Sequence, residues 1–127
     1  MWPLRIENPV YLQTIYGNHP DLSSVEITSA MMGRDGPSMH LAFISTVLPY
    51  RPPTKWGKFN AVSFGLEFIA VETISLRKFK SHGQSAIRMW DDEGKILLTC
   101  EGAVRLSLTC QFMRIKSISG ILLSQSP

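Results

Sequence analysis

The sequence is short of several features that mark common protein classes. It contains two cysteines in 127 residues, Cys100 and Cys110, and they are not in a CxxC arrangement. No apolar run approaches the roughly 18 residues of a membrane-spanning helix. The N-terminal stretch MWPLRIENP lacks the charged and apolar regions of a signal peptide. We therefore expect a soluble, cytoplasmic protein, one domain over residues 1–127, with no membrane partner.

The patterns of familiar catalytic and metal sites are also missing. The histidines His19, His40 and His82 stand at no metal-ligand spacing, whereas a zinc site needs about three or four ligands. The GRDGP stretch lacks the lysine and following helix of a phosphate-binding loop, and no G-x-S-x-G motif occurs. The acidic run at residues 91–93 is typical of a turn. These absences favour a protein that is not an enzyme and has no metal or other cofactor.

The composition is that of a globular protein with a mild positive charge. Hydrophobic residues make up 44% and charged residues 18%, which argues against disorder. The net charge of +3 permits an acidic partner or nucleic acid without requiring either. A hairpin over KILLTCEGAVRLSLTC is predicted to place Cys100 near Val104, with the two sulfurs about 20 Å apart. We therefore expect two buried thiols and no disulfide.

Apolar and polar residues alternate along most of the chain after residue 24. This pattern predicts an α+β protein that is mostly β, with antiparallel sheet of about seven strands built from hairpins. Hairpin turns are expected at GRDGP, at DDEG and near Glu101–Ala103. Residues 103–115 are expected to form one strand, and the tail a short edge strand. The predicted inward positions are Val25, Ile27, Ser29, Met31, Met39, Leu41, Phe43, Val62, Phe64, Leu66, Phe68, Ile74, Leu76, Val104, Leu106, Leu108, Cys110 and Phe112.

One short N-terminal helix is expected in ENPVYLQTIYG, residues 7–17. Asn8 suits the N-cap, Pro9 the first helical position and Gly17 the C-terminal stop. A helix of about two turns is not stable alone, so it must dock on the rest of the fold. The apolar face predicted for this docking comprises Tyr11, Leu12, Ile15 and Tyr16.

The stretch Leu48–Asn60, LPYRPPTKWGKFN, combines three prolines with a tryptophan and three basic residues. Its prolines remove backbone donors and fix φ, so no regular helix can run through it. We expect a rigid crossover with little entropy to lose on binding. The expected structural anchors are Pro52, Pro53 and Trp56. The expected partner-binding side chains are Tyr50, Arg51 and Lys55.

The order of these motifs resembles the Imm50 family of bacterial immunity proteins, which occur beside polymorphic toxins. The likeness rests on a W…NP..L..IYG..P.L opening, a DGP hairpin, the LP..PP.KW segment and an N.V.F.L.F strand. The matching residues are Trp2, Asn8, Pro9, Leu12, Ile15, Tyr16, Gly17, Pro20, Leu22, Asp35, Gly36, Pro37, Leu48, Pro49, Pro52, Pro53, Lys55, Trp56 and Asn60. The resemblance implies a protein that binds and blocks a cognate toxin; it supplies no toxin-contact residues.

Two functions from different classes are therefore open. The first is a non-catalytic immunity protein that neutralises a bacterial toxin by steric occlusion. The second is a small β-rich domain that binds single-stranded nucleic acid or a small ligand on exposed aromatic rings. Its expected platform is Tyr50, Trp56, Trp90 and the RKFK run at residues 77–80. The basic net charge is unusual for an inhibitor that masks a cationic nuclease site.

Overall fold

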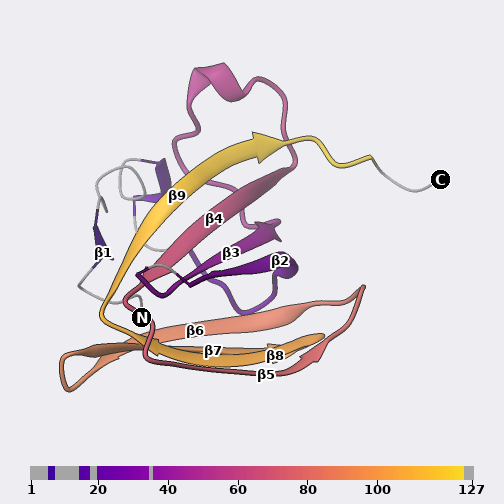
Figure 1. Ribbon diagram of the computed structural model, residues 1–127. Helices are drawn as coiled ribbons and strands as arrows, with labels where there is room; N and C mark the ends of the chain where they lie inside the picture. Colours follow the sequence, from indigo (N-terminus) through magenta and orange to yellow (C-terminus); the bar gives the residue numbers. More distant parts are fainter. Residues whose placement is uncertain (1–5, 8–14, 18–19, 35, 125–127) are drawn as a thin grey trace.

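The computed structural model describes residues 6–7, 15–17, 20–34 and 36–124. Two β-sheets lie face to face (Figure 1), with strand orders β1-β9-β4-β3-β2 and β5-β8-β7-β6. All pairings are antiparallel except that of the two-residue β1 with β9. The strands are β1 (Ile6–Glu7), β2 (Glu26–Gly33), β3 (Ser38–Ser45), β4 (Ala61–Ile69), β5 (Thr73–Phe79), β6 (Ser85–Asp92), β7 (Lys95–Gly102), β8 (Val104–Cys110) and β9 (Phe112–Ile121).

The core fills the space between the two sheets. Alternate side chains of every long strand except β5 enter it, because successive residues of a strand point to opposite faces. The Phe43 and Phe64 rings stack at its centre, with centroids 5.0 Å apart. Most of the predicted inward positions are confirmed. The buried ones are Val25, Ile27, Met39, Leu41, Phe43, Val62, Phe64, Leu66, Phe68, Val104, Leu106, Leu108 and Cys110.

The chain passes between the sheets twice, side by side, at one corner. Residues 70–72 connect β4 to β5, and Gln111 alone separates β8 from β9. The two passages bond each other, since the Gln111 N–H donates to the Ile69 carbonyl at 3.2 Å and the Glu72 N–H donates to the Thr109 carbonyl at 2.8 Å. Ala70 has a φ of 57°, a left-handed conformation that a non-glycine residue adopts only where the chain turns sharply. The corner thus fixes how one sheet sits on the other.

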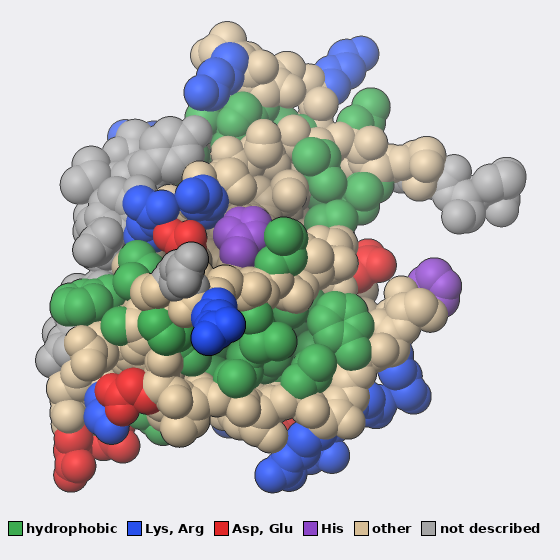
Figure 2. All heavy atoms as spheres, in the orientation of Figure 1, with side chains coloured by type: hydrophobic (Ala, Val, Ile, Leu, Met, Phe, Trp, Pro, Cys, Tyr) green, Lys and Arg blue, Asp and Glu red, His purple; other side chains and the backbone are tan. Residues whose placement is uncertain are grey.

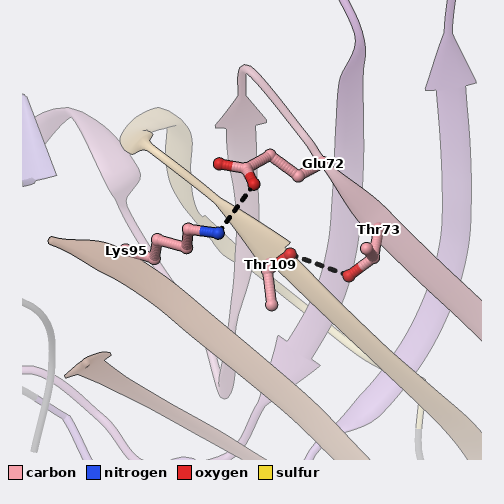
Figure 3. A network of polar contacts seen from close by, with 4 residues as sticks. All are labelled: Glu72, Thr73, Lys95 and Thr109. Carbon is pink, nitrogen blue, oxygen red and sulfur yellow. Dashed lines mark hydrogen bonds and ion pairs between the residues drawn. The ribbon is translucent and has the colours of Figure 1, made fainter. Parts of the chain in front are cut away.

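Polar side chains cover the solvent side of this corner (Figure 3). The Lys95 ammonium lies 2.8 Å from a Glu72 carboxylate oxygen, and the Thr73 and Thr109 hydroxyls are 2.7 Å apart. The hydrogen bond from Lys95 lowers the pKa of the Glu72 carboxyl and raises the pKa of the Lys95 ammonium. Both groups are solvent-exposed, so the pair contributes little to stability and serves mainly to position the end of β7.

The predicted count of seven strands is too low. The stretch 103–115, expected as one strand, is two strands that belong to different sheets and meet at Gln111. Phe112, predicted to face inward, starts the second of them and is 44% exposed. Beyond it β9 pairs with β4 along the whole length of β4, so the tail begins after a long strand rather than forming a short one.

Of the other predicted inward positions, Met31 is wrong, and three more are not fully buried. The β2–β3 register shifts between Ile27 and Ser29, and this bulge reverses the faces of the residues that follow. Ala30 therefore packs against the core, while Met31 is 65% exposed. Ile74 and Leu76 do face the interior side of their sheet, yet they remain exposed because β5 lies at its edge. Ser29, also predicted inward, is only partly buried.

The predicted N-terminal helix falls mostly on residues 8–14, which lie outside the described residues. Ile15 and Tyr16 have helical geometry and Gly17 has a φ of 72°, but no α-helix appears among the elements of the described chain. Its one helical element is the 3-10 turn η1 (Thr54–Trp56). Ile15 is buried, and the Tyr16 ring lies 5.9 Å from that of Phe64. No helix in the described part is long and apolar enough to cross a membrane.

Both cysteines are buried free thiols, as predicted. Their predicted register is wrong, because Cys100 lies opposite Leu106 and Cys110 lies opposite Ile96. The two thiols therefore stand on neighbouring strands, four residues apart along the ladder from Cys110 to Leu106. Burial raises the pKa of Cys100 to about 12 and the pKa of Cys110 to about 11.

Replacing the central ring should test the core. We expect Phe64→Ala to lower the free energy of unfolding by about 3–5 kcal/mol, because the cavity it leaves cannot fill with water or protein. Phe79→Ala is the matched control, since Phe79 is 46% exposed at the edge of the other sheet; it should cost less than about 1 kcal/mol. Urea denaturation measures both. Equal losses would contradict the position of β5 outside the core.

The thiols should be unreactive until the protein unfolds. The thiolate is the reactive form, and burial both disfavours it and blocks access, so native protein at about pH 8 should react with dithiobis-nitrobenzoate only at its unfolding rate. Denatured protein should release two equivalents of nitrothiobenzoate for Cys100 and Cys110. Rapid modification of either thiol in the native protein would show that the β7–β8 core is open to solvent.

Candidate partner-binding surface

Residues 46–60 form a crossover segment that joins β3 to β4 at the end of the five-stranded sheet (Figure 1). Neighbouring antiparallel strands need a loop of only about two to five residues. This connection is far longer and projects away from the four-stranded sheet. Its prolines prevent regular structure apart from η1, in which the Trp56 N–H donates to the Pro53 carbonyl at 3.1 Å. Long ordered loops of this kind commonly carry a binding function.

Hydrogen bonds hold both ends of the crossover segment. The Arg51 N–H donates to the Ile15 carbonyl at 2.7 Å, and the Tyr16 hydroxyl donates to the Val47 carbonyl at 3.0 Å. At the other end, the Asn60 amide donates to the Leu123 carbonyl at 3.0 Å and accepts from the Leu123 N–H at 2.7 Å. Residue 60 therefore ties the segment to the chain that leaves β9, and the loop is fixed before any partner binds.

Trp56 packs inward against β9. Its ring meets Phe59 edge to face, with centroids 5.3 Å apart and planes at 89°. Both rings rest on Gly120, where an added Cβ would lie 2.7 Å from Trp56 Cε3 and 3.0 Å from Phe59 Cγ. The absence of a side chain at Gly120 is therefore what admits the tryptophan. Of the two prolines expected to anchor the segment with it, Pro53 is partly buried and Pro52 is exposed.

The expected partner-binding side chains face solvent. Tyr50 is 81% exposed, and the Arg51 guanidinium carbon lies 6.0 Å from its ring centroid. Lys55 is exposed on η1. The structure adds apolar and basic side chains that the sequence reasoning missed, although the ILL run after Gly120 could have signalled two of them. The crossover surface, as we define it, comprises Val47, Leu48, Tyr50, Arg51, Lys55, Lys58, Leu122 and Leu123.

The crossover surface is cationic. Residues 46–60 include three basic side chains and no carboxylate, and Figure 2 shows Lys and Arg side chains projecting at this end of the molecule. The ion pairs of the described residues, Lys95–Glu72, Arg105–Glu101 and Arg114–Glu67, lie elsewhere. Arg51, Lys55 and Lys58 have no ion-pair partner in the described part of the chain. The surface is suited to an anionic protein.

Within the described residues, no three His, Cys, Asp or Glu side chains lie close enough to hold a metal ion. The aromatic platform expected for nucleic acid is not assembled either. Trp56 is packed on Gly120, whereas Trp90 lies on β6 and the RKFK run on β5 and just beyond it, in the four-stranded sheet. The crossover and that sheet are at opposite ends of the molecule (Figure 1).

Comparison with known proteins gives one significant likeness. The family model described as Immunity protein 50 (Imm50) matches residues 8–121, which is nearly the whole chain. Neither the curated proteins nor the solved structures give a significant match. The matched range includes all the long strands and the crossover segment. The chain therefore belongs to the Imm50 family of immunity proteins.

Proposed function

We propose that this protein binds one cognate toxin of a bacterial polymorphic toxin system and neutralises it by steric occlusion, without catalysis. Membership of an immunity-protein family gives the toxin as the general class of partner. The crossover surface is the proposed point of contact, with Tyr50, Arg51 and Lys55 as its central side chains. The observation that carries this proposal is a rigid, exposed aromatic and cationic loop held by bonds at both ends.

The composition of the crossover surface supports a protein partner. Tyrosine and arginine are enriched among the residues that contribute most to binding energy, particularly where apolar neighbours exclude water. Tyr50 and Arg51 are adjacent, and the exposed Leu48 lies two residues before Tyr50 in the same segment. Because the loop is already ordered by Trp56 and Asn60, little conformational entropy is lost when it binds.

The charge of the surface restricts the kind of toxin face that fits. Arg51, Lys55 and Lys58 attract an anionic patch and repel the cationic cleft of a nuclease. The proposed contact on the toxin is therefore an acidic or neutral surface, away from any nucleic-acid-binding cleft. Association steered by these charges should slow as ionic strength rises.

Tyr50→Ala and Arg51→Ala should each weaken the complex with the toxin domain encoded by the neighbouring gene about ten- to hundredfold. Calorimetry measures the affinity, and rescue of growth on co-expression measures neutralisation. Thermal stability should be unchanged, because both side chains are exposed. Arg88→Ala, an exposed arginine on β6, is the matched control and should bind normally.

Two results would overturn different parts of this proposal. If folded wild-type protein neither captures the toxin domain nor rescues growth, the assigned toxin is wrong. If wild-type protein binds and both variants bind equally well, the toxin contacts another face and the crossover surface loses its role.

Trp56→Ala should act through folding rather than contact. Loss of a half-buried ring that packs on β9 should lower the free energy of unfolding by about 2–3 kcal/mol, below the cost for a fully buried tryptophan. Trp90→Ala is the matched control, since Trp90 is 39% exposed on β6 and should cost less. Urea titration gives both values. Weakened toxin binding by Trp56→Ala with unchanged stability would identify Trp56 as a contact and not an anchor.

A further inference from the structure

A second surface lies where the two sheets are open toward solvent. β2 is an edge strand of one sheet and β5 is an edge strand of the other. A pocket of about 290 Å³ lies between them, and its walls include Met32, Met39, Val71 and Ile74. Figure 2 shows hydrophobic side chains gathered on this face, between the two sheets seen in Figure 1. We call this feature the β2–β5 groove.

From Ile74, which lines the groove, β5 continues as an uncovered part of the interior face of the four-stranded sheet. Ile74 lies opposite Leu108 and Leu76 opposite Leu106, and both leucines are buried. Directly opposite residues share a face of the sheet, so Ile74 and Leu76 point to the core side. They are nevertheless 38% and 49% exposed, because no strand of the other sheet covers them. Phe79, opposite the buried Val104, repeats this arrangement.

The backbone of β5 is free along its outer edge. The Lys80 N–H donates to the Ala103 carbonyl at 3.0 Å, next to the residue pair Phe79–Val104. In an antiparallel ladder this bond leaves the backbone groups of that pair pointing away from the strand opposite, so the N–H and C=O of Phe79 face away from β8. In the described chain no strand lies there. An extended polypeptide can therefore add to β5 by main-chain hydrogen bonds.

Charge indicates what kind of segment fits this edge. Arg77, Lys78 and Lys80 follow the apolar positions, and none of them forms an ion pair within the described residues. Lys78 lies opposite Arg105, so its side chain is on the outer face of the sheet. Like charges and the register shift near Arg77 disfavour pairing with the β5 of a second copy. An occupant with carboxylates is favoured instead.

The chain does not contain such an occupant among its remaining residues. Those outside the described ranges, 1–5, 8–14, 18–19, 35 and 125–127, include a single carboxylate side chain, Asp35. In the acidic run at residues 91–93, Asp91 and Asp92 are already paired with β7 as the end of β6, and Glu93 lies in the β6–β7 turn. A segment of another polypeptide therefore fits the charge of this edge better than any of these residues.

We propose that the β2–β5 groove binds an extended segment of a partner protein in which apolar and acidic residues alternate, added as a strand to the free edge of β5. The alternation follows from the two faces of the edge. Inward side chains of the segment contact Ile74, Leu76 and Phe79, while outward carboxylates contact Lys78 and Lys80. The four-stranded sheet that carries β5 is at the opposite end of the molecule from the crossover, and the proposal does not depend on the toxin contact there.

Titration of isotope-labelled protein with the peptide acetyl-VEVEVE-amide tests the proposal by NMR. We expect saturable shifts of the backbone amides of residues 73–79 and 31–33, and none in residues 48–58. The peptide acetyl-VKVKVK-amide has the same apolar content and should bind at least about tenfold more weakly, because its charges oppose those of β5. Equal affinity for the two peptides, no saturable shift, or shifts confined to residues 48–58 would overturn it.

Two variants separate strand addition from general charge attraction. R77S/K78S/K80S should weaken binding of acetyl-VEVEVE-amide about tenfold, since exposed ion pairs contribute modestly and three are lost. R51S/K55S/K58S removes the same charge at the other end and should leave the affinity unchanged. Equal weakening by both would show non-specific attraction and overturn the proposal.

A further variant, Phe79→Pro, removes an outward N–H of β5 while leaving the bonds to β8 in place, because proline is tolerated at a free edge. Phe79→Ala is its matched control, since it removes the same ring and keeps the N–H, and it should bind more strongly than Phe79→Pro. Phe79→Pro should abolish peptide binding with little change in melting temperature. If it unfolds the protein, R77S/K78S/K80S still decides the question. Sedimentation velocity of the free protein completes the test. Concentration-dependent self-association that R77S/K78S/K80S abolishes would assign the groove to a second copy and overturn the proposed partner.

Discussion

The architecture depends on the corner at which the chain changes sheets twice. The β4–β5 passage at residues 70–72 and the β8–β9 passage at Gln111 bond each other through backbone groups of Ile69, Gln111, Glu72 and Thr109. Because β4 and β9 then pair along the five-stranded sheet, while β5 and β8 pair in the other, one corner holds both sheets together. At another corner the join is a short one, made by the bridge between Val25 and Ser85 and by the Ile87 N–H, which donates to the Leu22 carbonyl at 2.9 Å. Between these corners, the edges of the two sheets are not required to pair with each other.

Both proposed surfaces follow from this arrangement. Since β4 continues into β5 at one end, its other end must be reached from β3 by a connection outside the sandwich, and the crossover segment is that connection. Its ordering depends on Trp56 filling the space that Gly120 leaves on β9. At the open side, β5 extends past the cover of the other sheet, which leaves Ile74 and Leu76 on the core side but exposed. The groove is a consequence of the sheets being held at corners rather than along their edges.

Turn motifs and the alternation of apolar and polar residues predicted the hairpin turns and the inward faces of several strands. The turns at GRDGP and DDEG and the inward residues of β3, β4 and β8 follow from turn chemistry and from a period of two. The division at Gln111 could not be predicted this way, because the alternation from Val104 to Phe112 is uninterrupted and only the opposite sheet decides where the strand ends. Likewise, the bulge near Thr28 adds one residue to β2 and leaves no mark in the composition. The sequence pattern therefore could not predict that Ala30 faces the core and Met31 faces solvent.

The candidate site was predictable to a similar extent. The prolines predicted a segment with no regular helix, and the short turn η1 is the helical element found in it. The partner-binding roles of Tyr50, Arg51 and Lys55 stay predictions. Leu122 and Leu123 belong to the crossover surface because hydrogen bonds join Asn60 to Leu123. These two residues are 63 positions apart in the sequence. No alternation or spacing reports a contact of this range. The role of Gly120 was equally hidden, since a glycine near the end of a strand has no side chain to show what lies against it.

The distribution of charge connects the two surfaces to the basic composition of the chain. Glu67, Glu72 and Glu101 are each paired with a cation on a sheet face, so these carboxylates compensate charge within the protein. The cations of the crossover and those after Leu76 on β5 have no such partners among the described residues. Six of the thirteen Lys and Arg side chains therefore lie in these two places, Arg51, Lys55 and Lys58 on the crossover and Arg77, Lys78 and Lys80 at the end of β5. Because the two places are on different elements, the two contacts that we propose, a toxin at the crossover and an acidic strand at β5, do not compete for the same side chains.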